Sequence, residues 1–264
     1  MTPVTEIDNT ATTTENPVDL QLQDRIATIT IGTGQRFNAL GLADWQALER
    51  ACAVMTADES LNGVVIRGRG GNFCAGSDLR EWGNATAQDV DGTFAQMERT
   101  MQAIEQLPMP TMAVIETIAA GAGCQLALAC DVQISGESAK IGMPVSRLGI
   151  LVPPAFAARL AERIGPSRAK DLLFSDRMLP APDAAAMGLI STVVPDEDLD
   201  RTLKETLTGW NTVSAASLRT AKSAVNAALK QLTEQSRHTA VALRATDRVE
   251  FPQRVGAFLG RHKR

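Results

Sequence analysis

The chain has 264 residues, of which 44% are hydrophobic and 21% are charged, and its formal net charge is -4. This composition indicates a globular protein with a large core, and the charge excludes the bulk positive field that binds nucleic acids and anionic membranes. Because no apolar run is long enough to span a membrane and no basic, then apolar, leader is present, we expect a cytoplasmic protein that binds neither nucleic acid nor membrane.

The cysteines do not form a metal-binding pattern. No two of Cys52, Cys74, Cys124 and Cys130 have the close spacing of a zinc site, and the chain has only two histidines. Cys52 falls on the apolar face of a predicted helix, and Cys124 and Cys130 lie in an Ala-rich helix. We therefore expect buried, free thiols and no metal.

The first part of the chain predicts a tail followed by alternating strands and helices. Residues 1–16 are polar and Thr-rich without an apolar period, so we expect disorder there, with folding beginning near Val18. Alternating side chains predict a strand over 24–31, helical spacing predicts a helix from Leu42 to Met55, and a buried strand follows over 62–67. This order predicts a parallel or mixed sheet covered by helices.

A first glycine-rich turn spans 68–79. Its four glycines stand among small and polar residues, so its backbone can approach a ligand closely. The polar residues over 80–91 predict a mobile surface segment. Apolar spacing then predicts a helix over 94–107, ended by two prolines, and a strand over 111–115 that leads into the next turn.

A second glycine-rich turn lies within 116–131, where an apolar strand gives way to small residues and restarts as an Ala/Leu-rich helix. The first N–H groups of a helix have no partner within it, and the helix dipole is positive there. The turn therefore suits an oxygen atom that carries negative charge. The alternative is that Gly121 and Gly123 only permit tight helix packing.

The rest of the chain is increasingly helical. We expect strands over 132–134 and 139–142 and helices over 156–164, 167–174 and 182–187, then further helices over 199–210, 215–232, 234–248 and 254–261. The chain is therefore divided into a disordered tail (1–16), a sheet-containing core (17–195) and a C-terminal helical region (196–264) that serves oligomer contacts or covers the site.

Both turns belong to an ordered set of motifs. In chain order these are Asn38-Ala39-Leu40, Phe73-Cys74-Ala75-Gly76-Ser77-Asp78-Leu79, the stretch 119–131, and Ala185-Ala186-Met187-Gly188-Leu189-Ile190. With this set the chain resembles the enoyl-CoA hydratase/isomerase family, the crotonase superfamily, from about Val18 to Leu259. The resemblance implies an α/β fold, a crotonase-like spiral of ββα units with a C-terminal helical region, assembled as a homotrimer or as a hexamer of two trimers.

The resemblance also implies a role for each turn. The backbone N–H groups of Ser77 and Ala122 bind the thioester oxygen of an acyl-CoA and stabilise the enolate that forms when charge moves onto that oxygen. The coenzyme A thioester is then the substrate or ligand, with no separate cofactor or metal. The implied substrate-binding residues are Arg36, Phe37, Ala39, Ala75, Gly76, Leu79 and Gly121.

Two positions depart from the family's hydratases, which carry one glutamate three positions after the second donor and another in a later Pro-Glu pair. Here these positions are Gln125 and Val145. Syn addition of water needs one group to activate the water and one to protonate the α carbon, and neither an amide nor a valine side chain takes up a proton. We therefore expect no efficient hydration by the usual route.

Other charged residues are candidates for lesser roles. Glu81, Asp89, Asp91 and Glu116 could carry out proton chemistry, although each also fits a structural or solvated role. His238 and His262 lie in the helical region and are expected at the surface. Candidates for binding the CoA phosphates are Lys140, Arg147, Lys222 and the four residues from Arg261 to Arg264.

Three functions are therefore open. The first is an acyl-CoA-handling member of the family in fatty-acid or CoA-ester metabolism, a lyase or isomerase if it is an enzyme. The second is a non-catalytic acyl-CoA-binding protein on the same fold. The third is a trimeric scaffold without affinity for CoA esters.

Overall fold

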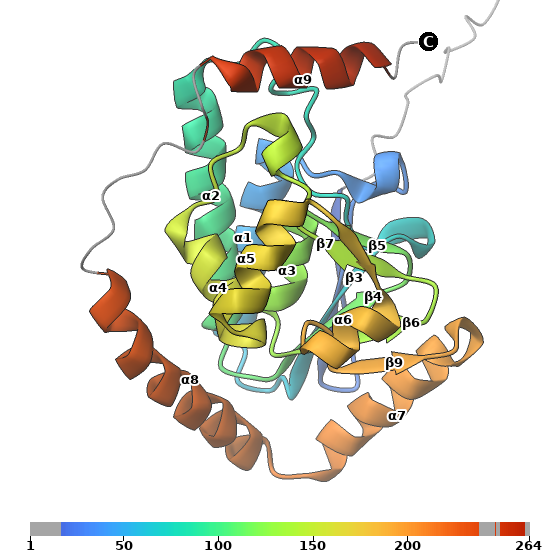
Figure 1. Cartoon of the computed structure of the whole chain (residues 1–264). Helices are drawn as coiled ribbons and strands as arrows, with labels where there is room; N and C mark the ends of the chain where they lie inside the picture. Colours follow the sequence, from blue (N-terminus) through green and yellow to red (C-terminus); the bar gives the residue numbers. More distant parts are fainter. Residues whose placement is uncertain (1–16, 238–245, 247–248, 262–264) are drawn as a thin grey trace, which may run out of the picture.

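The computed structural model describes residues 17–237, 246 and 249–261 (Figure 1). The strands of its larger sheet are β1 (Val18–Gln23), β2 (Ile26–Ile31), β3 (Gly63–Gly68), β4 (Thr111–Ile115), β6 (Val132–Gly136) and β9 (Thr192–Val194). They lie in the order β1-β2-β3-β4-β6-β9, and β1 pairs antiparallel with β2 while the other pairs are parallel. The predicted mixed sheet is confirmed.

A second, smaller sheet stands beside the first. It contains β5 (Ile118–Ala120), β7 (Lys140–Gly142) and β8 (Met178–Pro180). β5 pairs parallel with β7, and β7 pairs antiparallel with β8. The chain therefore leaves the larger sheet after β4, and the strand that feeds the second glycine-rich turn is β5, whereas the sequence pattern assigned this place to the strand over 111–115.

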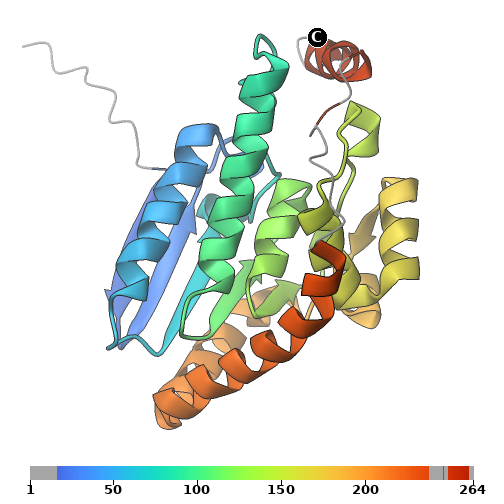
Figure 2. The same ribbon diagram turned by 90° about the vertical axis from the view of Figure 1, so that its left-hand side faces the viewer.

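Three helices, α1 (Leu42–Thr56), α2 (Ala87–Glu105) and α3 (Ala122–Ala129), lie side by side along one face of the larger sheet (Figure 2). The remaining helices are α4 (Pro154–Ile164), α5 (Pro166–Ser175), α6 (Ala181–Met187), α7 (Leu199–Thr212), α8 (Ala215–Arg237) and α9 (Glu250–Arg261). Because side chains of a strand alternate between faces, the sheet has two cores. Ile66 faces the main core, whereas Val65 packs with Leu199 and Leu203 of α7.

The structure differs from the predicted elements in several places. The predicted elements do not include the strands β1, β8 and β9, although the residues of β1 alternate between apolar and polar. The prediction of a separate helix over 234–248 is wrong where the structure describes these residues. Residues 234–237 belong to α8, which continues without a break to Arg237, and Thr246 forms an isolated bridge with Ile150. Within 80–91, Thr86 and Asp89 form a capping box at the start of α2, so the end of the segment predicted as mobile is part of an ordered helix.

Some predictions concern residues outside the described ranges. These are the disorder of residues 1–16 and the surface positions of His238 and His262. Within the described part of the chain, no helix combines the length and apolarity that crossing a membrane requires.

Candidate functional site

The first glycine-rich turn lies between Leu40 and β5 as an irregular strand. On one side, the Leu40 N–H donates to Gly76 O at 2.8 Å and the Asp78 N–H donates to Leu40 O at 2.9 Å. On the other side, the Ala120 N–H donates to Cys74 O at 3.0 Å. Leu40 and Ser77 form a parallel bridge in which Leu40 is hydrogen-bonded to Gly76 and Asp78, the two neighbours of Ser77. The N–H of Ser77 itself therefore points away from Leu40.

The second glycine-rich turn joins β5 to α3 through Gly121. Its backbone has φ 55° and ψ -118°, which an L-residue avoids, and its N–H donates to Gly142 O at 2.9 Å. α3 starts at the next residue, and the first hydrogen bond of the helix runs from the Gln125 N–H to Gly121 O at 3.1 Å. The Ala122 N–H therefore lies in the first turn of the helix, where donors have no partner in the helix.

The two turns are packed against each other at glycines. A Cβ placed on Gly76 would lie 3.2 Å from Ala122 N, and one placed on Gly123 would lie 2.1 Å from Cys74 O. At Gly121, by contrast, the nearest atom to such a Cβ is Val145 Cγ1 at 3.8 Å. Gly123 is thus required for close packing, as the alternative interpretation held, whereas Gly121 is required for its backbone conformation.

A cavity of about 290 Å³ opens beside both turns. Its lining residues are Ala75, Gly76, Ser77, Leu79, Trp82, Phe94, Met97, Ala120, Gly121, Ala122, Met143, Pro144, Val145, Arg147, Leu148, Ile150, Val152, Pro153, Phe156 and Phe258. None of these described residues is an aspartate, a glutamate or a histidine. The cavity therefore combines backbone donors with an almost entirely apolar wall, without a lining group for proton transfer.

The structure separates Gln125 and Val145, the two positions for which the family resemblance implies replaced glutamates. Val145 lines the cavity and is 8% exposed. Gln125 is fully buried and does not line the cavity. Its Oε1 accepts a hydrogen bond from Arg159 Nη1 at 3.0 Å, and its Nε2 donates to the carbonyl of Phe156 at 3.3 Å.

Arg159 connects Gln125 to two carboxylates of α2. Its Nε lies 2.5 Å from Glu105 Oε1, and its Nη2 lies 3.3 Å from Glu98 Oε1. Burial lowers the pKa of the guanidinium, but the carboxylates of Glu105 and Glu98 outweigh burial and raise it above its usual range. Phe156 separates this buried, charged cluster from the cavity, because its ring lies beneath the guanidinium and also lines the cavity.

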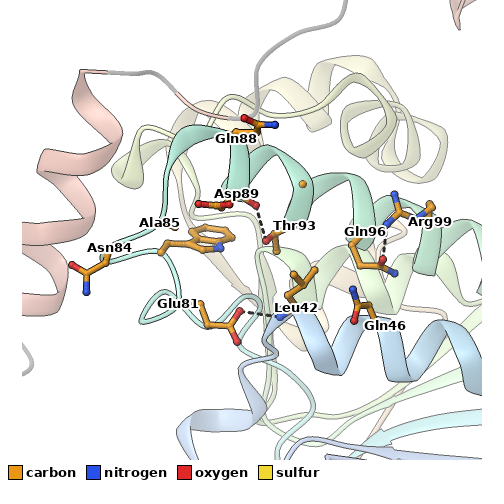
Figure 3. Close-up of a pocket in the computed structure, with 12 residues that line it drawn as sticks. Leu42, Gln46, Glu81, Asn84, Ala85, Gln88, Asp89, Thr93, Gln96 and Arg99 are labelled. Atoms are coloured by element: carbon orange, nitrogen blue, oxygen red, sulfur yellow. Dashed lines mark hydrogen bonds between the residues drawn. The ribbon is translucent and has the colours of Figure 1, made fainter.

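Of the four carboxylates considered for proton chemistry, Asp91 lies in α2 and does not line the cavity, and the other three have structural partners. Glu81 Oε2 accepts a hydrogen bond from the Leu42 N–H at 2.9 Å, at the start of α1. Asp89 caps α2 together with Thr86, and Glu116 forms an ion pair with Arg67. Figure 3 shows Glu81 and Asp89 around a second hollow between α1 and α2. Among the described residues, only Trp82 lines both this hollow and the cavity.

The predicted substrate-binding residues fall into two groups. Ala75, Gly76, Leu79 and Gly121 line the cavity with Ser77 and Ala122. Arg36, Phe37 and Ala39 do not line it. Arg36 forms a salt bridge with Asp78 at 2.8 Å, and Phe37 is 58% exposed.

Of the predicted phosphate-binding cations whose side chains the structure describes, which do not include Arg261 at the end of α9, one lines the cavity. Arg147 lines it and remains 74% exposed, with its Nε 3.6 Å from Asp176 Oδ2. Lys222 is instead buried against Asp131, at 2.8 Å, so it is a structural residue. Lys140 is exposed on β7, and residues 262–264 lie outside the described ranges.

Sequence reasoning missed the aromatic wall of the cavity. The rings of Trp82 and Phe94 stack at 5.5 Å between centroids, and those of Phe94 and Phe156 lie 6.1 Å apart. The helical spacing of Phe94 and Met97 was a signal for one buried face of α2. No local signal indicated that Phe258 of α9, far along the chain, reaches the same cavity.

The four thiols are free and buried, as predicted. Burial raises the pKa of Cys74 and of Cys124, which adjoin the two turns, to about 12. Cys74 Sγ accepts a hydrogen bond from the Gly76 N–H at 3.3 Å. These thiols are protonated at neutral pH and serve packing in the turns.

The small sheet, its two apposed turns and the cavity beside them define a crotonase-fold protein. Residues 21–253 match the family model for enoyl-CoA hydratase/isomerase, and the chain belongs to this family.

Its relatives agree with this assignment. The chain is 33% identical over 211 residues to a probable enoyl-CoA hydratase of Mycobacterium bovis, covering 80% of this chain and 81% of the relative. An enoyl-CoA hydratase structure from Bacillus anthracis has a TM-score of 0.77 and 28% identity, covering 94% of this chain and 97% of that one. An enoyl-CoA hydratase/isomerase from Xanthobacter autotrophicus shares the fold, with a TM-score of 0.84 at 24% identity over 94% of this chain and 93% of that one.

Proposed function

We propose that this protein binds an acyl-CoA thioester at the cavity, with the thioester oxygen between the N–H groups of Ser77 and Ala122, and that it hydrates enoyl-CoA poorly. Family membership and the two apposed turns support the binding. In other enzymes the loss of one such donor raises the barrier by roughly 2.7 to 4 kcal/mol. We further propose a role in CoA-ester metabolism in the cytoplasm and assembly as a homotrimer or a hexamer.

The lining of the cavity is the observation that supports the proposal of poor hydration. No described lining residue is a carboxylate or an imidazole, and Gln125 is bound to Arg159 behind Phe156. A general acid or base contributes roughly 10² to 10⁴ to a rate, so the loss of both from the cavity leaves only the stabilisation of negative charge on the thioester oxygen.

The same observation favours a second candidate, an acyl-CoA-binding protein without turnover. The two candidates share the binding step and differ only in whether the bound thioester reacts. An enzyme on this site would be a lyase or an isomerase whose proton-transferring groups come from the substrate or from bound water.

One pair of measurements separates these functions. Calorimetric titration with butyryl-CoA measures binding, and the absorbance of the conjugated thioester follows turnover of crotonyl-CoA and of a 3-enoyl-CoA. Binding with isomerisation or slow conversion supports the enzyme, and binding without turnover supports the second candidate. Rapid hydration of crotonyl-CoA would overturn the proposal of poor hydration. Absence of CoA-ester binding would overturn both candidates and leave the scaffold.

A further inference from the structure

Ser77 brings a hydroxyl group as well as a backbone N–H to the cavity. It is the only hydroxyl-bearing residue among the described residues that line it. The other lining side chains with N–H donors are Trp82 and Arg147, and the guanidinium of Arg147 is mostly exposed beside Asp176. The hydroxyl is thus the single side-chain O–H group among the described residues of a mostly apolar wall.

The partner of this hydroxyl is a poor one. Ser77 Oγ lies 3.2 Å from the thioether sulfur of Met97, which is fully buried in α2 and also lines the cavity. A thioether is a weak hydrogen-bond acceptor. A ligand oxygen that comes within reach would therefore replace a weak interaction with an ordinary hydrogen bond, in surroundings that exclude water.

Two other described lining side chains can donate to a ligand oxygen, the indole N–H of Trp82 and the guanidinium of Arg147, which is 74% exposed and paired with Asp176. Apart from Ser77 itself, none of the described lining residues carries a side-chain oxygen. Ser77 is therefore the lining residue whose side chain can both donate to and accept from an oxygen substituent of the bound acyl group.

The position of the hydroxyl decides which ligand oxygen it can reach. The N–H and the Oγ of one serine are separated by only two carbon atoms. If the N–H holds the thioester oxygen, the hydroxyl lies next to the first carbons of the acyl chain. An oxygen on the α or β carbon of the acyl group is close enough to the thioester oxygen for the same residue to bind both.

We propose that the Ser77 hydroxyl recognises an oxygen substituent on the α or β carbon of the acyl group, so that the site prefers hydroxyacyl or oxoacyl thioesters over unsubstituted ones. This proposal rests on the proposed function, because it requires the thioester oxygen at the Ser77 N–H. It goes beyond that function by assigning a role to the side chain, whereas the oxyanion site uses only the backbone.

The test compares ligands that differ by one oxygen atom. Calorimetric titration is carried out with butyryl-CoA, 2-hydroxybutyryl-CoA and 3-hydroxybutyryl-CoA, on the full chain and on its Ser77→Ala variant. The readout is the ratio of hydroxyacyl to butyryl affinity within each protein, which cancels any change in the binding of the CoA thioester as such. The alanine variant retains the backbone N–H at position 77.

We expect at least one hydroxyacyl-CoA to bind the unmodified protein roughly three- to tenfold more tightly than butyryl-CoA, the range of one net hydrogen bond. Ser77→Ala should abolish this preference. The matched variant Met97→Leu, which removes the competing thioether and keeps the hydroxyl, should retain it. Equal affinities in the unmodified protein, or a preference that survives Ser77→Ala, would overturn the inference while butyryl-CoA binding still supports the proposed function. Absence of binding by all three ligands would overturn both.

Discussion

At the scale of single residues, the side chain of Gln125 lies in a buried cluster and does not line the cavity. In this chain the amide is held by Arg159 and by the carbonyl of Phe156, so it is part of a buried cluster that joins α2, α3 and α4. Arg159 is buried, whereas Glu98 and Glu105 are 21% and 36% exposed, so solvent partly screens these two ion pairs. The side chain of Gln125 satisfies buried hydrogen-bonding groups of Arg159 and Phe156, so position 125 has a structural role here.

This arrangement gives opposite expectations for the two positions. Gln125→Glu should leave crotonyl-CoA hydration at the level of the unmodified protein, because the new carboxylate would pair with Arg159 behind Phe156. Val145→Glu should raise hydration by about tenfold or more, because it places a carboxyl group in the cavity, although an unoptimised group will not reach the full effect of roughly 10² to 10⁴. Loss of the conjugated thioester absorbance measures both rates.

The control for this pair is Val145→Gln, which has the same shape as the glutamate variant but cannot take up a proton. It should show no gain. The pKa of the introduced carboxyl should be raised by the apolar cavity, so the gain should increase with pH through the range where that group ionises. Hydration restored by Gln125→Glu alone would show that this side chain can turn into the cavity.

At the scale of elements, the turn between β5 and α3 depends on one backbone conformation. Gly121 has φ 55° and ψ -118°, and a Cβ placed there would meet Val145 Cγ1 at 3.8 Å, an ordinary contact, so the requirement for glycine is conformational. Gly121→Ala should lower stability by about 1 to 3 kcal/mol and weaken butyryl-CoA binding, because relief of the strain shifts the Ala122 N–H. Urea denaturation and calorimetric titration measure the two effects.

A second glycine provides the comparison. Gly92 lies in α2 with open space around it, so Gly92→Ala should leave binding unchanged and raise stability slightly, as alanine favours a helix. If both alanine variants bound butyryl-CoA like the unmodified protein, the conformation of Gly121 would have no role in the site.

Elements with a clear local period were predictable from the sequence. The helices α1 and α2 and the strands β3 and β4 follow their apolar spacing, and the two glycine-rich turns were recognisable by composition. β1 was missed although Val18 to Gln23 alternate strictly between apolar and polar residues, which is the pattern of a half-buried strand. The direction of Gln125 could not be predicted, because it depends on Arg159, which comes from another helix.

At the scale of the whole molecule, long-range packing completes the cavity and encloses the thiols. Phe251 of α9 packs on Trp82 with 5.7 Å between ring centroids, and Phe258 of the same helix lines the cavity, so the end of the chain covers a site built by its middle. Cys52, Cys74, Cys124 and Cys130 are all buried in the main core, on elements that span much of the chain. Their ionisation therefore reports on global unfolding.

The thiols predict a loss of stability at alkaline pH. Burial raises the pKa of Cys52, Cys74 and Cys124 from 9.0 to about 12, and burial also raises that of Cys130. Between about pH 9 and 12 the unfolded chain loses thiol protons that the native protein retains. Since the unfolded state binds fewer protons there, the free energy of unfolding must fall as pH rises, by about 1 kcal/mol per cysteine at pH 10.

Urea denaturation at pH 8 and at pH 10 measures this loss, and the chain contains no tyrosine whose ionisation would add to it. Cys52→Ala should lower stability at pH 8, because it leaves a cavity, but should reduce the difference between the two pH values by about 1 kcal/mol. Cys52 is the informative choice because it lies in α1, away from the lining of the cavity. The prediction would be contradicted if stability did not depend on pH in this range, or if Cys52→Ala left the dependence unchanged. Either result would mean that the thiols ionise in the folded protein as readily as in the unfolded chain. Thiols that ionise in the folded protein would also be alkylated rapidly in the native state.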